Sequence, residues 1–88
     1  MLEKTLEKRL VEKTKKAGGM AIKWTSPNMA GVPDRLVFLP GGRVICVELK
    51  RPGEKPTPLQ LKVHQRLRDL GADVRVIDSD QQIEELLS

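Results

Sequence analysis

Two apolar runs, residues 35–39 and 43–50, flank the turn sequence Pro40-Gly41-Gly42. This pattern predicts an antiparallel hairpin. With a three-residue loop, Asp34 and Glu48 stand directly opposite each other at the open end, and another loop length moves that pairing by about one position. Like charges opposed on neighbouring strands are destabilising unless something offsets them, and a divalent cation would do so.

Lys50 adds a positive charge to this pair of acids. It shares a face with Glu48, because side chains two positions apart on a strand point the same way. Two carboxylates and a nearby ammonium group can hold Mg²⁺, a phosphate oxygen and an attacking water. Residues 44–49 are otherwise apolar, as in a central strand covered on both faces. An ion pair between Glu48 and Lys50 would satisfy these charges by itself, but it leaves Asp34 unexplained.

The order of acid, spacer and acid-x-Lys resembles the PD-(D/E)xK nuclease superfamily. The fuller string Gly31-Val32-Pro33-Asp34, followed by Glu48-Leu49-Lys50 and then Gln60, is similar to the VRR-NUC family within it. The resemblance covers nearly the whole chain. It implies a restriction-endonuclease-like domain in which Asp34 and Glu48 bind Mg²⁺ or Mn²⁺ with help from the Leu49 carbonyl. Lys50 would then position the attacking water and stabilise charge that develops on the phosphate.

The resemblance also implies an acid on the first helix, followed three residues later by an apolar residue. Glu7 and Leu10 match this pattern, so Glu7 is the candidate that completes or supports the metal site, and Glu3 is the second choice. Judged from the residues alone, Glu7 is a solvated charge paired with a neighbouring lysine of the helix.

Gln60 falls in the first turn of the second expected helix. The resemblance implies that its amide borders the active site and touches Lys50 or a phosphate, and the alternative is a solvated helix residue. His64 lies one turn further along, where it could approach the same edge. A lone histidine on a helix is more often a surface or capping residue than a general base.

Hydrophobic periodicity predicts the remaining elements. We expect helices over about 2–17 and 58–71, strands over 20–25 and 74–77, and a last helix capped by Ser79. The order helix, three strands, helix, strand, helix predicts an α/β fold with a mixed sheet flanked by helices, and residues 1–88 forming a single domain. The expected buried stripes are Leu2, Leu6, Leu10 and Val11 on the first helix and Leu59, Val63, Leu67 and Leu70 on the second.

The chain carries a net charge of +4, which is compatible with a polyanionic partner. Side chains suited to phosphate contacts occur in the loops and on the second helix. The alternative for these residues is an ordinary solvated surface. The candidates for DNA binding are Lys23, Ser26, Asn28, Arg51, Lys55 and Lys62.

Composition bounds the class of protein and its location. The single cysteine, Cys46, excludes an intrachain disulfide and a site built from cysteines. No run approaches the roughly 18 apolar residues of a membrane-spanning helix, and the N-terminus resembles no signal peptide. We therefore expect a cytoplasmic protein without a membrane partner.

Together these patterns predict a metal-dependent endodeoxyribonuclease. Small free-standing members of the resembled family are similar in fold to archaeal Holliday-junction resolvases, which act as homodimers, so a homodimer that cuts branched DNA is the expected form. A nicking or flap-type endonuclease is the alternative within enzymes. A non-catalytic basic module that binds nucleic acid, or a small interaction domain whose acids merely pair with arginines, is the alternative outside them.

Overall fold

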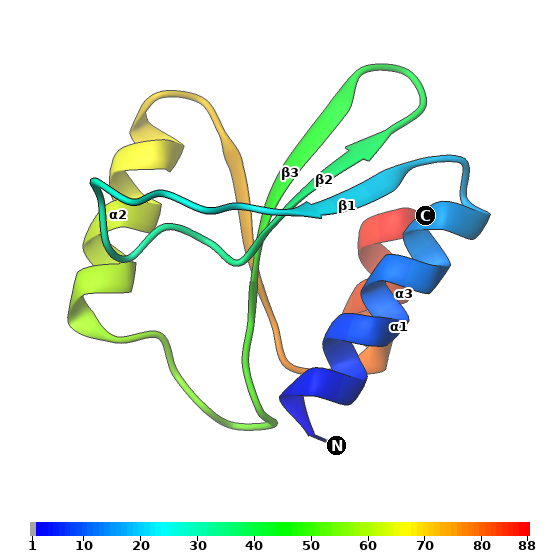
Figure 1. The fold of residues 1–88 in the computed structure, drawn as a ribbon, viewed down its shortest axis with the longest axis horizontal. Coiled ribbons are helices and arrows are strands. Elements are labelled where there is room, and N and C mark those ends of the chain that lie inside the picture. Colours follow the sequence, from blue (N-terminus) through cyan, green and yellow to red (C-terminus); the bar gives the residue numbers. More distant parts are fainter. Residues whose placement is uncertain (1) are drawn as a thin grey trace.

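A computed structural model describes residues 2–88 and confirms the predicted order of elements (Figure 1). Four strands form a mixed sheet in the order β1-β2-β3-β4, in which β1, β2 and β3 are antiparallel and β4 runs parallel to β3. The elements are α1 (Glu3–Lys16), β1 (Met20–Lys23), β2 (Arg35–Leu39), β3 (Arg43–Leu49), α2 (Pro58–Asp69), β4 (Asp73–Ile77) and α3 (Asp80–Leu87).

The hairpin of β2 and β3 has the predicted register. Leu39 pairs with Arg43, which leaves a loop of three residues, and Gly41 and Gly42 take the left-handed conformations that this loop requires. At the other end, Arg35 pairs with Val47. Continued by one residue, that register sets Asp34 opposite Glu48.

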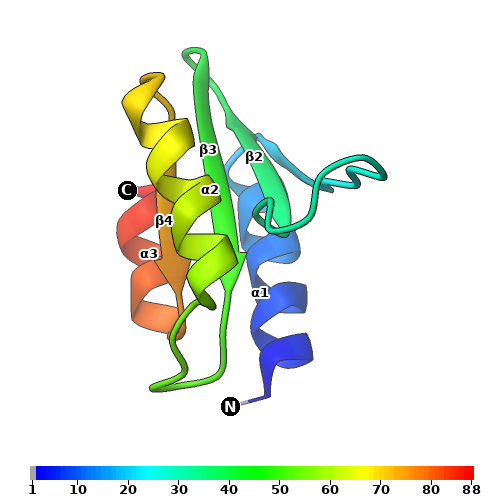
Figure 2. The ribbon, with the colours of Figure 1, turned by 90° about the vertical axis from the view of Figure 1, so that its left-hand side faces the viewer.

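The helices cover the sheet from both sides. Figures 1 and 2 show α1 and α3 side by side on one face and α2 on the other. Strand alternation assigns the odd-numbered residues of β3 to the α1/α3 face and the even-numbered ones to the α2 face. The main aliphatic core lies on the α1/α3 face and consists of Leu6, Leu10, Ala21, Val37, Leu39, Ile45, Val47, Leu49, Ile77, Ile83 and Leu86.

The α2 face has a different composition. Helix α2 packs chiefly against β4. Between α2 and the sheet, the buried apolar residues are Cys46, Val63 and Val74, and the buried polar residues are Glu48 and His64. Toward the hairpin end and the β1 edge, this face stays open, with exposed side chains at Met20, Ile22, Phe38 and Val44.

Two predicted helix stripes were partly wrong. Leu2 precedes α1 and is 69% exposed. On α2, Leu59 and Leu70 are 50% and 72% exposed, whereas Val63 and His64 are buried. The helix is rotated so that the histidine faces the sheet, because the strand beneath it presents a polar Glu48. The first strand also ends at Lys23, two residues earlier than predicted.

The cap of the last helix was predicted correctly. The Ser79 hydroxyl accepts a hydrogen bond from the Gln82 N–H, and Gln82 Oε1 accepts one from the Ser79 N–H. The two bonds form a capping box. Ile83 and Leu86 of α3 are buried against α1, and Lys13 of α1 binds Asp80 of α3 at 3.1 Å. No helix among residues 2–88 combines the length and apolar character needed to cross a membrane.

Candidate active site

Asp34 lies immediately before β2, where the chain enters the sheet. Its own carbonyl accepts a hydrogen bond from Trp24 N–H at 3.0 Å, and its Oδ2 accepts one from Leu49 N–H at 2.8 Å. In a longer ladder the Leu49 N–H would donate to a backbone carbonyl of the neighbouring strand. Here the Asp34 carboxylate takes the place of that carbonyl. The backbone on both sides holds Asp34 at the open end of the hairpin.

Pro33 lies just beyond the end of the ladder. The last paired residues are Arg35 and Val47, and proline has no N–H with which to extend the pairing. The N–H and C=O of one strand residue point to the same edge, so the Leu49 carbonyl is directed to the edge where Asp34 accepts the Leu49 N–H. No residue of β2 pairs with Leu49, so its carbonyl has no backbone donor from that strand. The oxygen that the family resemblance implies as a ligand is thus directed to the edge where Asp34 lies.

Glu48 is the buried centre of the site, with 2% of its surface exposed. Its Oε2 accepts a hydrogen bond from Gln60 Nε2 at 3.2 Å and lies 3.6 Å from Lys50 Nζ. Burial, and after it the charge of Asp34, raise the pKa of Glu48 to about 7, while Lys50 acts in the opposite direction. The nearby ammonium group of Lys50 therefore offsets only part of the effect of burial and of the second acid.

Gln60 reaches Glu48 because the start of α2 fixes its side chain. Thr57 is the N-cap: its hydroxyl accepts from Gln60 N–H at 3.2 Å, and Gln60 Oε1 accepts from Thr57 N–H at 2.9 Å. With its oxygen held in this capping box, the amide nitrogen points to Glu48. Gln60 therefore lies beside the candidate site, as the resemblance implies. Its partner in the structure is Glu48, whereas we expected Lys50 or a phosphate.

The sequence left the place of His64 open between the edge of the site and the surface or a helix end. In the structure its side chain is fully buried and its Nε2 lies 3.6 Å from Glu48 Oε1. Burial, and then the charges of Arg68 and Lys50, lower the pKa of His64. Both effects favour the neutral ring over the charged one. Its spacing of four residues from Gln60 indicated the approach to the site, because residues so spaced share a helix face, but nothing in the sequence indicated the burial.

Glu7 approaches the sheet from the face opposite to that of Glu48. Its Oε2 accepts a hydrogen bond from Arg35 Nε at 2.9 Å, and Arg35 also donates to the Ala21 carbonyl at 3.0 Å. Arg35 pairs with Val47, a core residue of the α1/α3 face. Glu7 is consequently held on the α1 side of the sheet, whereas Glu48 is turned toward α2.

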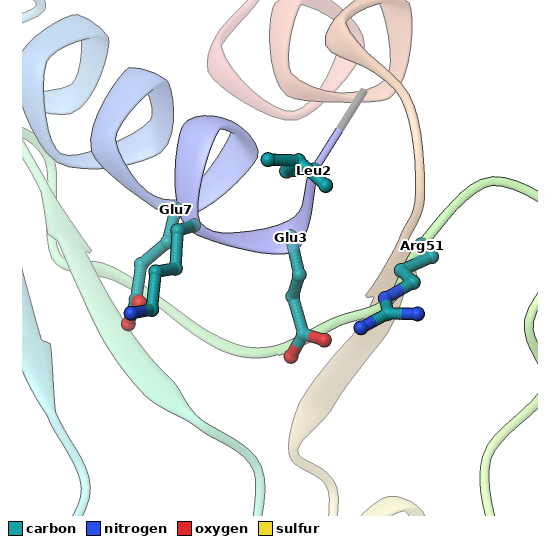
Figure 3. A pocket seen from close by; sticks show the side chains of 5 residues that line it. Leu2, Glu3, Glu7 and Arg51 are labelled. Atoms are coloured by element: carbon teal, nitrogen blue, oxygen red, sulfur yellow. The ribbon is translucent and has the colours of Figure 1, made fainter.

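A pocket of about 410 Å³ opens beside the N-terminal end of α1. Figure 3 shows Glu3 and Arg51 directed into the same space, with Glu7 at its far side. Arg51 follows Lys50 directly in the chain, so the pocket adjoins the end of β3. Its lining residues are Leu2, Glu3, Lys4, Glu7 and Arg51.

The candidate DNA contacts are distributed around the site end and over α2. Lys23 ends β1, and the half-buried Ser26 and exposed Asn28 lie in the following loop. Arg51 and Lys55 are exposed in the loop before α2, and Lys62 is exposed on α2. The structure leaves these side chains accessible, apart from the partial burial of Ser26.

The residues present suit a hard divalent cation. Residues 2–88 contain no group of three His, Cys, Asp or Glu side chains placed to hold a metal. The Asp34 and Glu48 carboxylates with the Leu49 carbonyl nevertheless form an oxygen donor set, and Mg²⁺ usually takes one or two carboxylates and keeps several waters. A donor set made of oxygen atoms alone fits such an ion.

Comparison with known proteins gives a consistent result. No family model matches the sequence. The chain is 57% identical over 77 residues to "Putative nuclease p44" of Acyrthosiphon pisum secondary endosymbiont phage 1, covering 88% of this chain and 83% of the phage protein. A solved structure described as a VRR_NUC domain superposes with a TM-score of 0.89 at 37% identity, covering 97% of this chain and 92% of that one. With the motif order described above, these similarities show that the chain belongs to the VRR-NUC family of nucleases.

Proposed function

We propose that this nuclease is a metal-dependent endodeoxyribonuclease that uses Mg²⁺ or Mn²⁺. The observation that carries the proposal is the buried Glu48, which faces Asp34 across the hairpin and has Lys50 on its own face. A buried acid opposite a second acid is unfavourable for the fold alone. The arrangement is suited to a cation that both carboxylates share.

Asp34, Glu48 and the Leu49 carbonyl would hold this cation. When bound, it would supply Lewis acidity toward a phosphate oxygen and lower the pKa of a water. The backbone positions two of the three donors: Leu49 N–H orients the Asp34 carboxylate, and the Leu49 carbonyl has no partner residue on β2. Glu7 supports this end of the site from α1 through its contact with Arg35.

Lys50 acts on the substrate in this proposal. Its ammonium group lies 3.6 Å from Glu48 Oε2 and is mostly buried. From there it can donate a hydrogen bond to the attacking water or to a phosphate oxygen, where negative charge develops during cleavage. Gln60 keeps the neighbouring Glu48 in place while this occurs.

The test is cleavage of a labelled four-way junction beside a matched linear duplex, in EDTA, Mg²⁺ or Mn²⁺. Wild type is compared with Glu48→Gln, and Glu12→Gln, at an exposed position of α1, is the matched control. We expect metal-dependent cutting by the wild type and the control and none by Glu48→Gln. Binding without cutting in every metal would favour the non-catalytic basic module.

The preferred substrate in this proposal is branched DNA such as a Holliday junction, cut by a homodimer. Two copies would bring two active sites to two strands, and dimerisation enlarges the footprint of a chain of 88 residues. The exposed apolar side chains Met20, Phe38 and Val44, which lie in one row across three strands, are compatible with a surface that a second copy covers.

Two measurements test the substrate and the dimer separately. Light scattering at working concentration should give the mass of two chains, and a single-chain mass would contradict the dimer. Rates on junction, flap and linear duplex substrates should favour the junction. Preference for the flap, or nicking of the linear duplex, would support the alternative endonuclease classes and leave the metal chemistry intact.

A further inference from the structure

The imidazole of His64 is fully buried, yet neither ring nitrogen has a hydrogen-bond partner within residues 2–88. Buried polar groups are nearly always paired, so an unpaired buried histidine requires an explanation. The other positions of α2 that face solvent could have carried this residue without cost. Its position on the side of α2 that faces the sheet therefore points to a partner on the sheet.

The facing atom is Glu48 Oε1, at 3.6 Å from His64 Nε2. This oxygen is also buried and lacks a hydrogen-bond partner in the same described part of the chain. A donor and an acceptor, both unsatisfied, thus face each other at a distance only slightly longer than a hydrogen bond. A small movement of either side chain would satisfy both.

The second oxygen of the same carboxylate is already bound from the same helix. Gln60 Nε2 donates to Glu48 Oε2 at 3.2 Å. Gln60 and His64 are one turn apart on the same face of α2, so each faces a different oxygen of one carboxylate. A carboxylate held at both oxygens cannot rotate freely, and the direction of its remaining lone pairs is set.

We propose that His64 is a positioning residue that donates its Nε2–H to Glu48 Oε1 and, together with Gln60, fixes the orientation of the Glu48 carboxylate. The neutral ring carries one N–H, and this assignment places it on Nε2. The inference rests on the proposed function in one respect: the fixed carboxylate is the one that would bind the cation. Groups that orient a metal ligand in this way typically affect metal affinity strongly.

The experiment compares His64→Leu, which removes both nitrogens, with His64→Gln, whose amide N–H has a similar reach. Gln65→Leu, at an exposed neighbouring position of α2, is the matched control. Mn²⁺ affinity is measured by calorimetric titration, and thermal unfolding is measured in EDTA. We expect His64→Leu to weaken Mn²⁺ binding by roughly 10- to 100-fold, and His64→Gln to restore most of it. A purely structural role would change the melting temperature without this rescue.

Nitrogen NMR of the metal-free wild type supplies a readout that needs neither a variant nor a metal. The ¹⁵N shifts of the His64 ring should show the Nε2–H tautomer with a hydrogen-bonded proton. An Nδ1–H tautomer, or unchanged Mn²⁺ affinity in His64→Leu, would overturn the proposal. If His64→Leu does not fold, the tautomer and the His64→Gln affinity decide the question. If folded wild type binds no Mn²⁺, the proposed metal site fails, and the tautomer alone still decides the role of His64.

Discussion

The two faces of the sheet are built on opposite principles, although β3 contributes to both. On the α1/α3 face, Ile45, Val47 and Leu49 join an aliphatic core closed by two helices. On the α2 face, the same strand presents Val44 to solvent and Glu48 to a buried histidine. One face supplies the stability that the other, with its buried charge, does not supply. Substitutions on the two faces should therefore have separable effects.

The largest effect is expected on the α2 face. Glu48→Gln should lower cleavage by at least about 100-fold, comparable to the loss of one charge-stabilising group in other active sites. Unfolding of the metal-free variant should occur at the same temperature or higher, because a buried carboxylate has been replaced by a neutral amide. Cleavage rates and calorimetric melting in EDTA provide both quantities. A variant that is unstable as well as inactive would break the separation between the faces.

The reciprocal substitution is Leu10→Ala on α1. Leu10 is fully buried in the aliphatic core, so its truncation should lower the free energy of unfolding by about 2–5 kcal/mol. Cleavage measured well below the melting temperature should remain close to that of the wild type. Denaturant titration and a rate measurement on the same preparation test this. Loss of activity at a temperature where the variant is folded would show that the two faces are coupled.

A third prediction concerns pH. The pKa of Glu48 rises from 4.5 to about 7 in the folded protein, so the folded state binds this proton more tightly than the unfolded state does. The stabilising contribution is full below about pH 4.5 and is lost as the pH rises from there through 7, a change on the order of 3 kcal/mol.

Chemical denaturation in EDTA at pH 5 and pH 8 measures this loss. Glu48→Gln has no such proton, so its difference between the two pH values should be smaller than that of the wild type by this amount. Equal differences in the two proteins would show that the carboxylate is already ionised at pH 5.

The smallest effect is expected at Glu7. Its partner is Arg35 on the α1 side of the sheet, so Glu7→Gln should reduce cleavage by roughly 10-fold, at the lower limit for groups that support a site indirectly. Arg35→Gln should give a similar reduction. If Glu7→Gln is as inactive as Glu48→Gln, then Glu7 acts at the metal site directly and not only through Arg35.

The hairpin and the helix caps were predictable because local rules determine them. The apolar runs and Pro40-Gly41-Gly42 fix the register that sets Asp34 opposite Glu48, and Ser79 begins α3 through its own side chain. These features depend on residues close together in the chain. The order of elements follows from the same short-range patterns.

The face that α2 turns to the sheet was not predictable in this way. Periodicity assigned Leu59 and Leu70 to the interior, but both are exposed and His64 is buried. The decisive partner is Glu48, sixteen positions before His64 in the chain and on another element. A hydrophobicity pattern treats a histidine as polar and places it outside, so it cannot anticipate a buried polar pair. The contact between Glu7 and Arg35 was not predictable either, because the two residues lie on different elements, 28 positions apart in the chain.

Pro33 links the length of β2 to the proposed chemistry of the site. A residue with an N–H at that position would offer a backbone donor near the Leu49 carbonyl, which proline does not. In the proposed mechanism this carbonyl is a ligand, so such a donor would compete with the cation. Pairing of the strands and binding of the cation would then favour different residues at position 33.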